Sequence, residues 1–371
     1  MNKGLQKITR YFQVYGFSRT LIKVAGRTRK RYLRYWFVKL QFRSRKNVSL
    51  IGCGQFGFST ISYFLLKQVG NCFLECYDIV PENQRSTASF WGYSEQPDTI
   101  KLISNNQCEI VFIASNHASH TAYAVEALNQ NKLVYLEKPI SVTYDQLREL
   151  LAAQKENPGN LFVGYNRPFS AAIRKLNGYI RDNKLPITLN CFIVGHFIEK
   201  DHWYRHPQEG TRICGNVGHW IDLAVNILYT RGVVPHTFSV DVSYSNPAES
   251  DDNISIALTT DYLDLINIVM TSRAEPFEGI SEAIQFQSGT VIAKIDDFRR
   301  MDVWNDYRKR TYRFNPKDVG HKKAIYQPFD SEKRNFDEVK ISTVIMLEIA
   351  DMVRNGEKRR IINPADVLTG L

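Results

Sequence analysis

The chain of 371 residues has no apolar run close to the roughly 20 residues that a membrane-spanning helix needs. Its first residues mix charges with aromatic rings and lack the apolar segment and small-residue cleavage site of a secretion signal. Its six cysteines are scattered and never show the Cys-x-x-Cys spacing typical of zinc sites, so no metal is predicted. The sequence therefore favours a cytoplasmic protein with reduced thiols, long enough for two domains.

Acidic residues are absent from the first 46 positions. The whole chain has 48 Lys and Arg against 38 Asp and Glu, and residues 1–46 hold fourteen of the basic residues. The rest of the chain therefore has 34 basic and 38 acidic residues, so the net charge of +10 comes entirely from this N-terminal arm. The remainder is mildly acidic.

The arm also contains many aromatic residues, among them Tyr11, Phe12, Tyr32, Tyr35 and Trp36. A basic, aromatic and helical segment suits an anionic membrane surface, where cations meet phosphates and rings lie among the headgroups. We therefore expect peripheral association with the inner face of the cytoplasmic membrane. Packing of the arm on its own chain or on a partner subunit is the alternative. Nucleic acid fits the composition less well and is not a predicted partner.

A glycine-rich turn follows the first apolar strand, over residues 47–57. It reads Gly52-Cys53-Gly54-Gln55-Phe56-Gly57, and a helical pattern follows it. In the dinucleotide fingerprint the first glycine allows a tight turn, the second lets the backbone approach a pyrophosphate, and the third lets helix and strand pack closely. The pyrophosphate then lies on the free N–H groups of the helix N-terminus. A glycine turn that has lost its nucleotide remains the alternative.

A second predicted strand, over residues 72–77, ends in Asp78. A carboxylate at this position binds the ribose hydroxyls of NAD. No Arg or Lys directly follows Asp78, so the 2′-phosphate of NADP would meet repulsion with little compensation. The sequence therefore predicts NAD in preference to NADP.

Strands and helices alternate up to about residue 163, which predicts a doubly wound parallel sheet. From about residue 186 short strand patterns follow one another, interrupted by one helical pattern over residues 218–228, and a last amphipathic helix over residues 339–354 is expected to pack back. The predicted fold class is α/β, with a second α+β domain built on a large, mostly antiparallel open sheet. The predicted boundaries are an arm at 1–46, a dinucleotide-binding domain at 47–167 and a substrate and oligomerisation domain at 168–371.

Two short motifs can carry chemistry. Glu137-Lys138-Pro139 follows a predicted strand, at the sheet edge where parallel sheets bind ligands, and a lysine there can polarise a hydroxyl or carbonyl group. His219 and Asp222 are three residues apart, so on a helix they share a face, and a histidine can accept a hydroxyl proton as hydride leaves. A surface turn and a packed or capping histidine are the corresponding structural alternatives.

Taken together these motifs resemble the glucose–fructose oxidoreductase / inositol dehydrogenase (Gfo/Idh/MocA) family. The matching segments lie in the family's order and are residues 52–57, Ile113 to His120, Glu137 to Pro139, Val163 to Phe169 and Gly218 to Asp222. The resemblance implies a Rossmann domain, an open-sheet domain, a homodimer or homotetramer, and Lys138 and His219 on either side of the nicotinamide and the reacting carbon. It implies cofactor contacts from Ser115, Asn116, His120 and Glu137 in addition to the glycine loop. It implies substrate contacts from Tyr165, Arg167, Tyr204, Arg212, Asn216 and His219.

One position departs from the family pattern. The usual Asp four residues before the histidine is Gly215 here, and the adjacent Asn216 cannot accept a proton. Segments at 201–210, 296–300 and 320–322 resemble a subgroup linked to bacterial surface polysaccharides. The predicted function is an NAD-dependent oxidoreductase acting on a sugar, in nucleotide-linked form. The alternatives are a non-catalytic NAD- or sugar-binding partner and an epimerase or lyase that recycles bound NAD.

Overall fold

The computed structural model describes residues 3–38, 44–273 and 279–371. Contacts divide the chain into two units. The parallel-sheet unit contains residues 17–165 and 321–334, and the antiparallel-sheet unit contains residues 1–16, 166–320 and 335–371. Residues 17–38, which the sequence places in the arm, thus belong to the parallel-sheet unit.

The parallel-sheet unit is built on six parallel strands in the order β3-β2-β1-β4-β5-β6. The strands are β1 (Val48–Ile51), β2 (Phe73–Tyr77), β3 (Ser94–Glu95), β4 (Ile110–Ile113), β5 (Leu133–Leu136) and β6 (Leu161–Val163). The helices between them are α3 (Ser62–Gln68), α4 (Pro81–Trp91), α5 (Thr99–Ser104), α6 (His117–Asn129) and α7 (Tyr144–Glu156). All residues of β1 and β4 are buried, as in a sheet covered on both faces. The predicted doubly wound sheet is confirmed.

The basic arm forms most of helix α1 (Lys3–Thr28), which is broken at Gly16, where φ is 78° and ψ is 170°. After this break, Ile22 and Ala25 are fully buried in the core of the parallel-sheet unit, together with Phe58 and Leu65. Tyr63 of α3 exchanges a 2.7 Å hydrogen bond with Ser18. The 3-10 turn η1 (Arg31–Arg34) and α2 (Tyr35–Val38) follow. Of the interpretations of the arm, packing on its own chain therefore describes residues 17–29.

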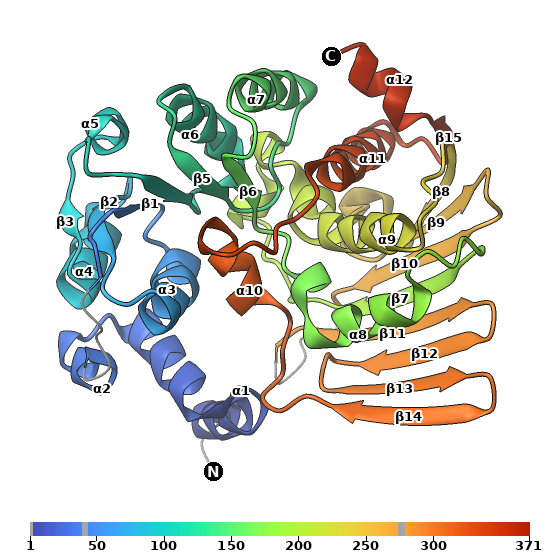
Figure 1. Ribbon diagram of the computed structural model, residues 1–371, viewed down its shortest axis with the longest axis horizontal. Coiled ribbons are helices and arrows are strands. Elements are labelled where there is room, and N and C mark those ends of the chain that lie inside the picture. The colour runs from blue at the N-terminus through green and yellow to red at the C-terminus, as the bar shows by residue number, and fades with distance from the viewer. Residues whose placement is uncertain (1–2, 39–43, 274–278) are drawn as a thin grey trace. The chain divides into compact units, whose positions relative to one another are not determined.

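The antiparallel-sheet unit contains nine strands in the order β14-β13-β12-β11-β7-β10-β9-β8-β15 (Figure 1). The strands are β7 (Thr188–Val194), β8 (Phe238–Tyr244), β9 (Ile254–Thr260), β10 (Leu265–Thr271), β11 (Ser281–Ser288), β12 (Val291–Asp296), β13 (Arg300–Asn305), β14 (Arg308–Arg313) and β15 (Arg359–Ile362). Only β7 and β10 pair in parallel. The predicted, mostly antiparallel sheet is confirmed, and β13 to β15 are additions to it.

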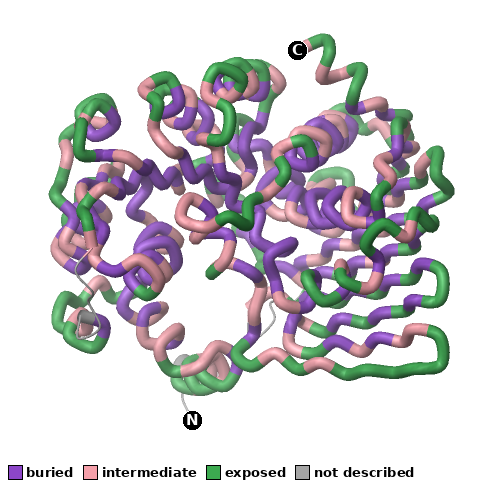
Figure 2. The backbone as a smooth tube through the Cα atoms, viewed as in Figure 1, coloured by how far each residue is buried: buried purple, intermediate pink, exposed green. Residues whose placement is uncertain are grey.

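Burial alternates along most strands of this sheet, so one face is packed and the other is open (Figure 2). The helices of this unit are α8 (Ala171–Ile180), α9 (Gly218–Thr230), α11 (Phe336–Asn355) and α12 (Pro364–Thr369), and α10 (His321–Tyr326) belongs to the parallel-sheet unit. Figure 1 shows α8 and α9 over one face of the sheet, and α11 packs on α9. Phe192, Leu265 and Ile292 are exposed on the other face. Within the described ranges, no helix is long and apolar enough to span a membrane.

Candidate cofactor and substrate sites

The glycine loop has three glycines with three different surroundings. Gly52 has φ of +96°, and a Cβ there would lie 2.4 Å from the backbone of Ala114. A Cβ on Gly57 would lie 2.1 Å from the carbonyl oxygen of Gly52, closer than any real contact. A Cβ on Gly54, in contrast, would have no protein atom within 4 Å. Gly52 and Gly57 are thus required by the fold, whereas Gly54 faces open space that a ligand can approach.

The helix after this loop starts with a π-helical turn, η2 (Gly57–Ile61), which continues into α3. The N–H of Phe58 donates to the carbonyl of Gly54 at 3.0 Å, so the turn is continuous with the glycine loop. The backbone N–H groups of a first helical turn have no partner within the helix. Together with the helix dipole they form a site for an anion such as a pyrophosphate.

Asp78 lies directly after β2, and backbone groups hold its carboxylate. Its Oδ2 accepts from the N–H of Cys53 at 2.7 Å, and its Oδ1 accepts from the N–H of Val80 at 2.8 Å. A carboxylate oxygen has further acceptor capacity beyond one such bond. Asp78 can therefore accept ribose hydroxyls while it stays fixed to the glycine loop.

His120 of α6 connects the ends of two neighbouring strands. Its Nε2 lies 2.5 Å from the carbonyl oxygen of Ser115, after β4, and its Nδ1 lies 3.1 Å from the carbonyl oxygen of Glu137, after β5. The carbonyl oxygen of Pro139 is also within 3.3 Å of Nδ1. Burial lowers the pKa of His120, although its carbonyl partners oppose this shift. Nδ1 of the imidazole thus faces the carbonyl groups on both sides of Lys138.

Asn116, the residue before α6, is held within its own turn. Its side-chain oxygen lies 2.6 Å from the Oγ of Ser119, which also lies 2.7 Å from the Oγ of Ser115. Ser115, Asn116 and Ser119 therefore form one hydrogen-bonded group at the carboxyl end of β4. This is the edge of a parallel sheet where ligands bind.

The side chain of Glu137, the residue before Lys138, is buried. The hydroxyl of Tyr135 donates to its Oε1 at 3.0 Å. Burial raises the pKa of Glu137 to about 7, and the nearby Lys138 charge offsets part of that rise. A Cβ on Gly164 would lie 2.7 Å from the same carboxyl group, so the Glu137 side chain packs directly on the backbone of Gly164. Lys138 itself is half-buried at the carboxyl end of β5 and precedes a cis peptide bond to Pro139.

Tyr135 and Gly164 were not identified as site residues from the sequence. Tyr135 and Glu137 are two residues apart, which in a strand places both side chains on one face. That spacing is a signal that could have identified Tyr135. No comparable pattern identifies Gly164. Tyr165, which the sequence assigns to substrate, is buried at the end of this unit.

In the antiparallel-sheet unit, a second π-helical turn, η6 (Ile213–Val217), leads into α9. Such turns often occur at functional sites. Asn216 and His219 are half-buried here. Asp222, one turn further, is fully buried, and its Oδ1 accepts from the hydroxyl of Ser342 of α11 at 3.4 Å. Although Asp222 shares a helix with His219, its carboxylate lies against α11.

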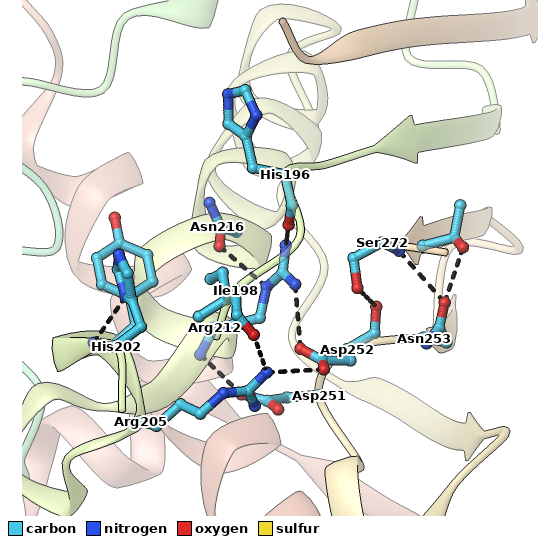
Figure 3. Close-up of polar contacts among 12 residues, drawn as sticks. His196, Ile198, His202, Arg205, Arg212, Asn216, Asp251, Asp252, Asn253 and Ser272 are labelled. Atoms are coloured by element: carbon cyan, nitrogen blue, oxygen red, sulfur yellow. Dashed lines mark hydrogen bonds and ion pairs between the residues drawn. The ribbon is translucent and has the colours of Figure 1, made fainter. Parts of the chain in front are cut away.

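Arg212 is one of the largest fully buried side chains. It donates to Asp252 at 3.0 Å, to the carbonyl oxygen of His196 at 3.0 Å and to the side-chain oxygen of Asn216 at 3.3 Å (Figure 3). Its backbone N–H also donates to Asp251 at 2.8 Å. With its amide oxygen facing Arg212, Asn216 presents its NH₂ group for another partner.

Arg205 lies next to this cluster (Figure 3). Arg205 donates to Asp252 at 2.9 Å and to the carbonyl oxygens of Ile198 and Glu199. The Tyr204 ring makes edge contacts with His202 and Trp203. Asp252 thus binds two arginines, so neither guanidinium is presented alone to a ligand.

Arg167 is also part of an internal ion pair. Its guanidinium donates to Glu282 and lies 4.6 Å from the centre of the Trp220 ring of α9. Glu282 lies 3.7 Å from Lys317, which binds Asp297 at 2.5 Å. Contact of Arg167 and Arg212 with a substrate stays a prediction, and the structure gives both residues partners within the fold.

No group of three or more His, Cys, Asp or Glu side chains in the part of the chain that the structure describes is placed to hold a metal ion. The six cysteines are free and buried. His117 and His120 lie with ring centres 5.7 Å apart in an edge arrangement.

Comparison with known proteins shows which family this part of the chain is similar to. Residues 46–165 match the model of the Gfo/Idh/MocA family, an oxidoreductase family with an NAD-binding Rossmann fold. These residues are thus similar to the Rossmann domain of this family. The matched segment contains the glycine loop, Asp78, the turn at Ser115 and the Glu137-Lys138-Pro139 motif. The predicted NAD-binding Rossmann domain is therefore confirmed.

Curated relatives match less than half of the chain. An inositol 2-dehydrogenase from Burkholderia multivorans is 26% identical over 149 residues, which are 39% of this chain and 44% of the relative. An inositol 2-dehydrogenase from Ralstonia nicotianae is 27% identical over the same shares. The chain thus spans less than half the length of these curated relatives.

Solved structures share the fold over most of the chain. GenD2 from gentamicin A biosynthesis, in complex with NAD, has a TM-score of 0.71 at 14% identity and covers 86% of this chain and 97% of its own. Levoglucosan dehydrogenase, in complex with NADH and L-sorbose, has a TM-score of 0.70 at 15% identity and covers 86% and 99%. At this identity these likenesses establish the two-sheet fold.

Proposed function

We propose that the protein is an NAD-dependent oxidoreductase that transfers hydride between a hydroxyl-bearing carbon of a sugar and the nicotinamide. The observation that carries this proposal is the glycine loop, with open space at Gly54 and with Asp78 fixed beside it. The similarity to inositol and levoglucosan dehydrogenases supports a polyhydroxylated substrate. A nucleotide-linked sugar, used for polysaccharide or glycolipid precursors, is the more specific form of the proposal.

In this proposal Lys138 stabilises the developing alkoxide and His219 accepts the hydroxyl proton. The contacts around Lys138 support its role, because the ring of His120 lies against the flanking carbonyl groups and Glu137 lies beside it in the interior. Asn216 donates its NH₂ group to a sugar oxygen. With Gly215 in place of the family's Asp, His219 is the one proton acceptor assigned on α9.

The first test is Lys138→Ala. Turnover should fall at least tenfold while NADH remains bound, because the lysine acts on the reacting centre and not on the cofactor's adenosine half. Lys155→Ala, on the exposed side of α7, serves as the matched control and should keep wild-type turnover. Unchanged turnover in Lys138→Ala would remove this lysine from the mechanism.

The small molecules that copurify with the protein distinguish the alternatives. The full chain is denatured, and mass spectrometry identifies what it releases. NAD together with a nucleotide-sugar would support the specific proposal, and NAD alone would leave the sugar to a substrate screen. Product formation without net NADH would indicate an epimerase or lyase. Binding without any hydride exchange would indicate the non-catalytic partner.

We also propose that the first part of the arm contacts an anionic membrane surface. Leu5, Ile8 and Phe12 are exposed along one side of α1, at 54%, 44% and 46%. The same stretch of the sequence contains Lys7 and Arg10, so apolar and basic residues alternate along it. The protein should sediment with phosphatidylglycerol vesicles but not with phosphatidylcholine vesicles, and Phe12→Ser should weaken this binding several-fold. Equal binding to both lipids would contradict an electrostatic contribution.

The open face of the nine-stranded sheet is the proposed contact with a second copy. Its exposed apolar side chains Phe192, Leu265 and Ile292 would be covered in a dimer or tetramer. Light scattering of the wild type and of Phe192→Asp tests this proposal, since a buried aspartate would dissociate the oligomer.

A further inference from the structure

Arg29 has a backbone conformation that an arginine rarely adopts. It directly follows α1, its N–H donates to the carbonyl of Ala25 at 2.7 Å, and its φ is +53°. Glycine is usual at this position after a helix, and another residue costs about 1 kcal/mol there. The contacts of the arginine side chain are therefore of interest, because glycine cannot make them.

The guanidinium of Arg29 joins three parts of the parallel-sheet unit. Its Nη2 donates to the carbonyl oxygen of Cys53 in the glycine loop at 3.0 Å, and its Nη1 donates to the hydroxyl of Thr87 in α4 at 3.0 Å. Its Nε donates to the carbonyl of Gly26 in α1 at 2.9 Å. It also lies over the ring of Phe58, 4.3 Å from the ring centre. A side chain from the arm is thus built into the wall of the glycine loop.

A second contact joins the same helix to the loop. A Cβ on Gly26 would lie 2.7 Å from the amide nitrogen of Gln55, so the Gln55 side chain packs directly on the backbone of α1. The carbonyl of Ser59, in the turn after the loop, accepts from Arg19 at 2.8 Å. Residues 17–29 therefore contact the glycine loop and the helical turn that follows it.

Asp78 and Arg29 hold opposite ends of one residue. The N–H of Cys53 donates to Asp78, and the carbonyl of Cys53 accepts from Arg29. These two bonds fix the orientation of the peptide groups on both sides of Cys53, including the peptide that leads into Gly54. Burial lowers the pKa of Arg29, and the nearby Cys53 and Asp78 counteract this shift. The guanidinium also supplies positive charge near Asp78 that is not apparent from the sequence around Asp78.

We propose that Arg29 is a positioning residue of the dinucleotide site, which fixes the glycine loop and Asp78 for the adenosine-diphosphate half of the cofactor. This inference rests on the proposed function, because it requires that the protein binds NAD. It makes residues 17–29 of the basic arm a structural part of the cofactor site.

The test measures the binding of NADH, ADP-ribose and reduced nicotinamide mononucleotide to the full chain. Arg29→Gln should weaken the binding of NADH and the binding of ADP-ribose by the same factor, about tenfold, as expected for the loss of a charge-assisted hydrogen bond. Affinity for the mononucleotide should stay unchanged, because it lacks the adenosine half. Arg27→Gln removes the same charge two residues earlier, from an exposed position, and should bind all three ligands like the wild type.

A second variant separates binding from folding. Arg29→Gly relieves the left-handed backbone, so its melting temperature should fall less than that of Arg29→Gln, while its NADH affinity should fall at least as far. If both variants bind NADH like the wild type, the positioning role is wrong and the proposed function stands. If binding of the mononucleotide weakens by the same factor, the substitution has loosened the whole site, and the positioning role would also be overturned. A wild-type protein that does not bind NADH would overturn both proposals.

Discussion

The two units of this protein build their candidate sites in different ways. In the parallel-sheet unit, backbone groups form most of the candidate site. They are the N–H groups of the glycine loop, the carbonyl groups that face His120 and the N–H groups that fix Asp78. In the antiparallel-sheet unit, the residues near α9 are held by ion pairs between side chains, above all the pairs of Asp252 with Arg205 and Arg212. A site of the first kind depends on a few glycines, whereas a site of the second kind depends on each charged partner.

This difference explains why sequence comparison detects the site in the parallel-sheet unit and not the site in the antiparallel-sheet unit. A backbone site requires glycine at fixed spacings, and this requirement leaves a pattern that family models detect over residues 46–165. An ion-pair site can be rebuilt with other charges at other positions. The antiparallel-sheet unit can therefore keep its fold, as the TM-scores of 0.71 and 0.70 indicate, while its sequence diverges.

The largest expected effect comes from Arg212→Ala. It removes a charge whose side chain is 1% exposed and leaves Asp252 buried with one partner fewer. Losing one partner of a buried pair costs about 3–5 kcal/mol of folding free energy. Arg205→Ala removes the more exposed partner of the same aspartate and should cost much less. Denaturant unfolding measures both variants. An Arg212→Ala protein of normal stability with a raised KM would show instead that Arg212 serves the substrate.

The next effect concerns the pH dependence of stability and comes from Glu137. Burial raises its pKa from 4.5 to about 7 in the folded protein. Between these two pH values the folded state keeps a proton that the unfolded chain has lost. The stabilisation of the folded state by protonated Glu137 is therefore complete below pH 4.5 and is lost as the pH rises through 7. A shift of this size corresponds to about 3 kcal/mol. Melting temperatures between pH 4.5 and 7 should fall more steeply for the wild type than for Glu137→Gln.

The exposed Glu126→Gln variant is the control for that slope and should follow the wild type. If Glu137→Gln shows the same slope as the wild type, the Glu137 carboxyl group does not hold its proton in the folded state. The backbone-built site would then contain a buried carboxylate, and Lys138 would be its natural partner.

The smallest effect on stability is expected for Gly54→Ala. Its new methyl group would have no protein atom within 4 Å, so the folding free energy should change by no more than about 1 kcal/mol. NADH affinity should nevertheless fall about tenfold or more, because the methyl group occupies the space that the pyrophosphate needs. Gly57→Ala provides the contrast, since its Cβ would collide with the carbonyl of Gly52 and should also destabilise the fold by about 1–3 kcal/mol. Normal NADH affinity in Gly54→Ala would mean that the cofactor does not lie on this loop.

Much of the fold was predictable because burial leaves a regular pattern. Strands such as β8 and β9 were expected from the short strand patterns after residue 186, since their buried and open faces alternate. The glycine loop and the Asp78 position were predictable because backbone geometry demands those residue types. The prediction of NAD in preference to NADP rested on the residues that follow Asp78.

The remainder was not predictable from local pattern. Strand β14 is exposed on both faces, so its Arg-Lys-Arg-Thr-Tyr-Arg sequence has no apolar alternation. Arg29 reaches the glycine loop from 24 residues before Cys53, and no spacing rule connects the two. The internal partners of Arg167 and Arg212, Glu282 and Asp252, lie far along the chain. Sequence shows that an arginine is present, but only the fold shows whether its charge is already neutralised.

Strand β14 has a consequence for how copies of this protein meet. It ends the nine-stranded sheet, and four of its six residues, Arg308, Lys309, Arg310 and Arg313, are basic (Figure 1). Two such edges approaching each other would bring like charges together along the whole strand, so the sheet is protected against growth into fibres. Salt screens this repulsion, with a screening length of about 8 Å at physiological ionic strength and about 3 Å at 1 M. Concentrated salt is therefore the condition in which this edge would first permit aggregation.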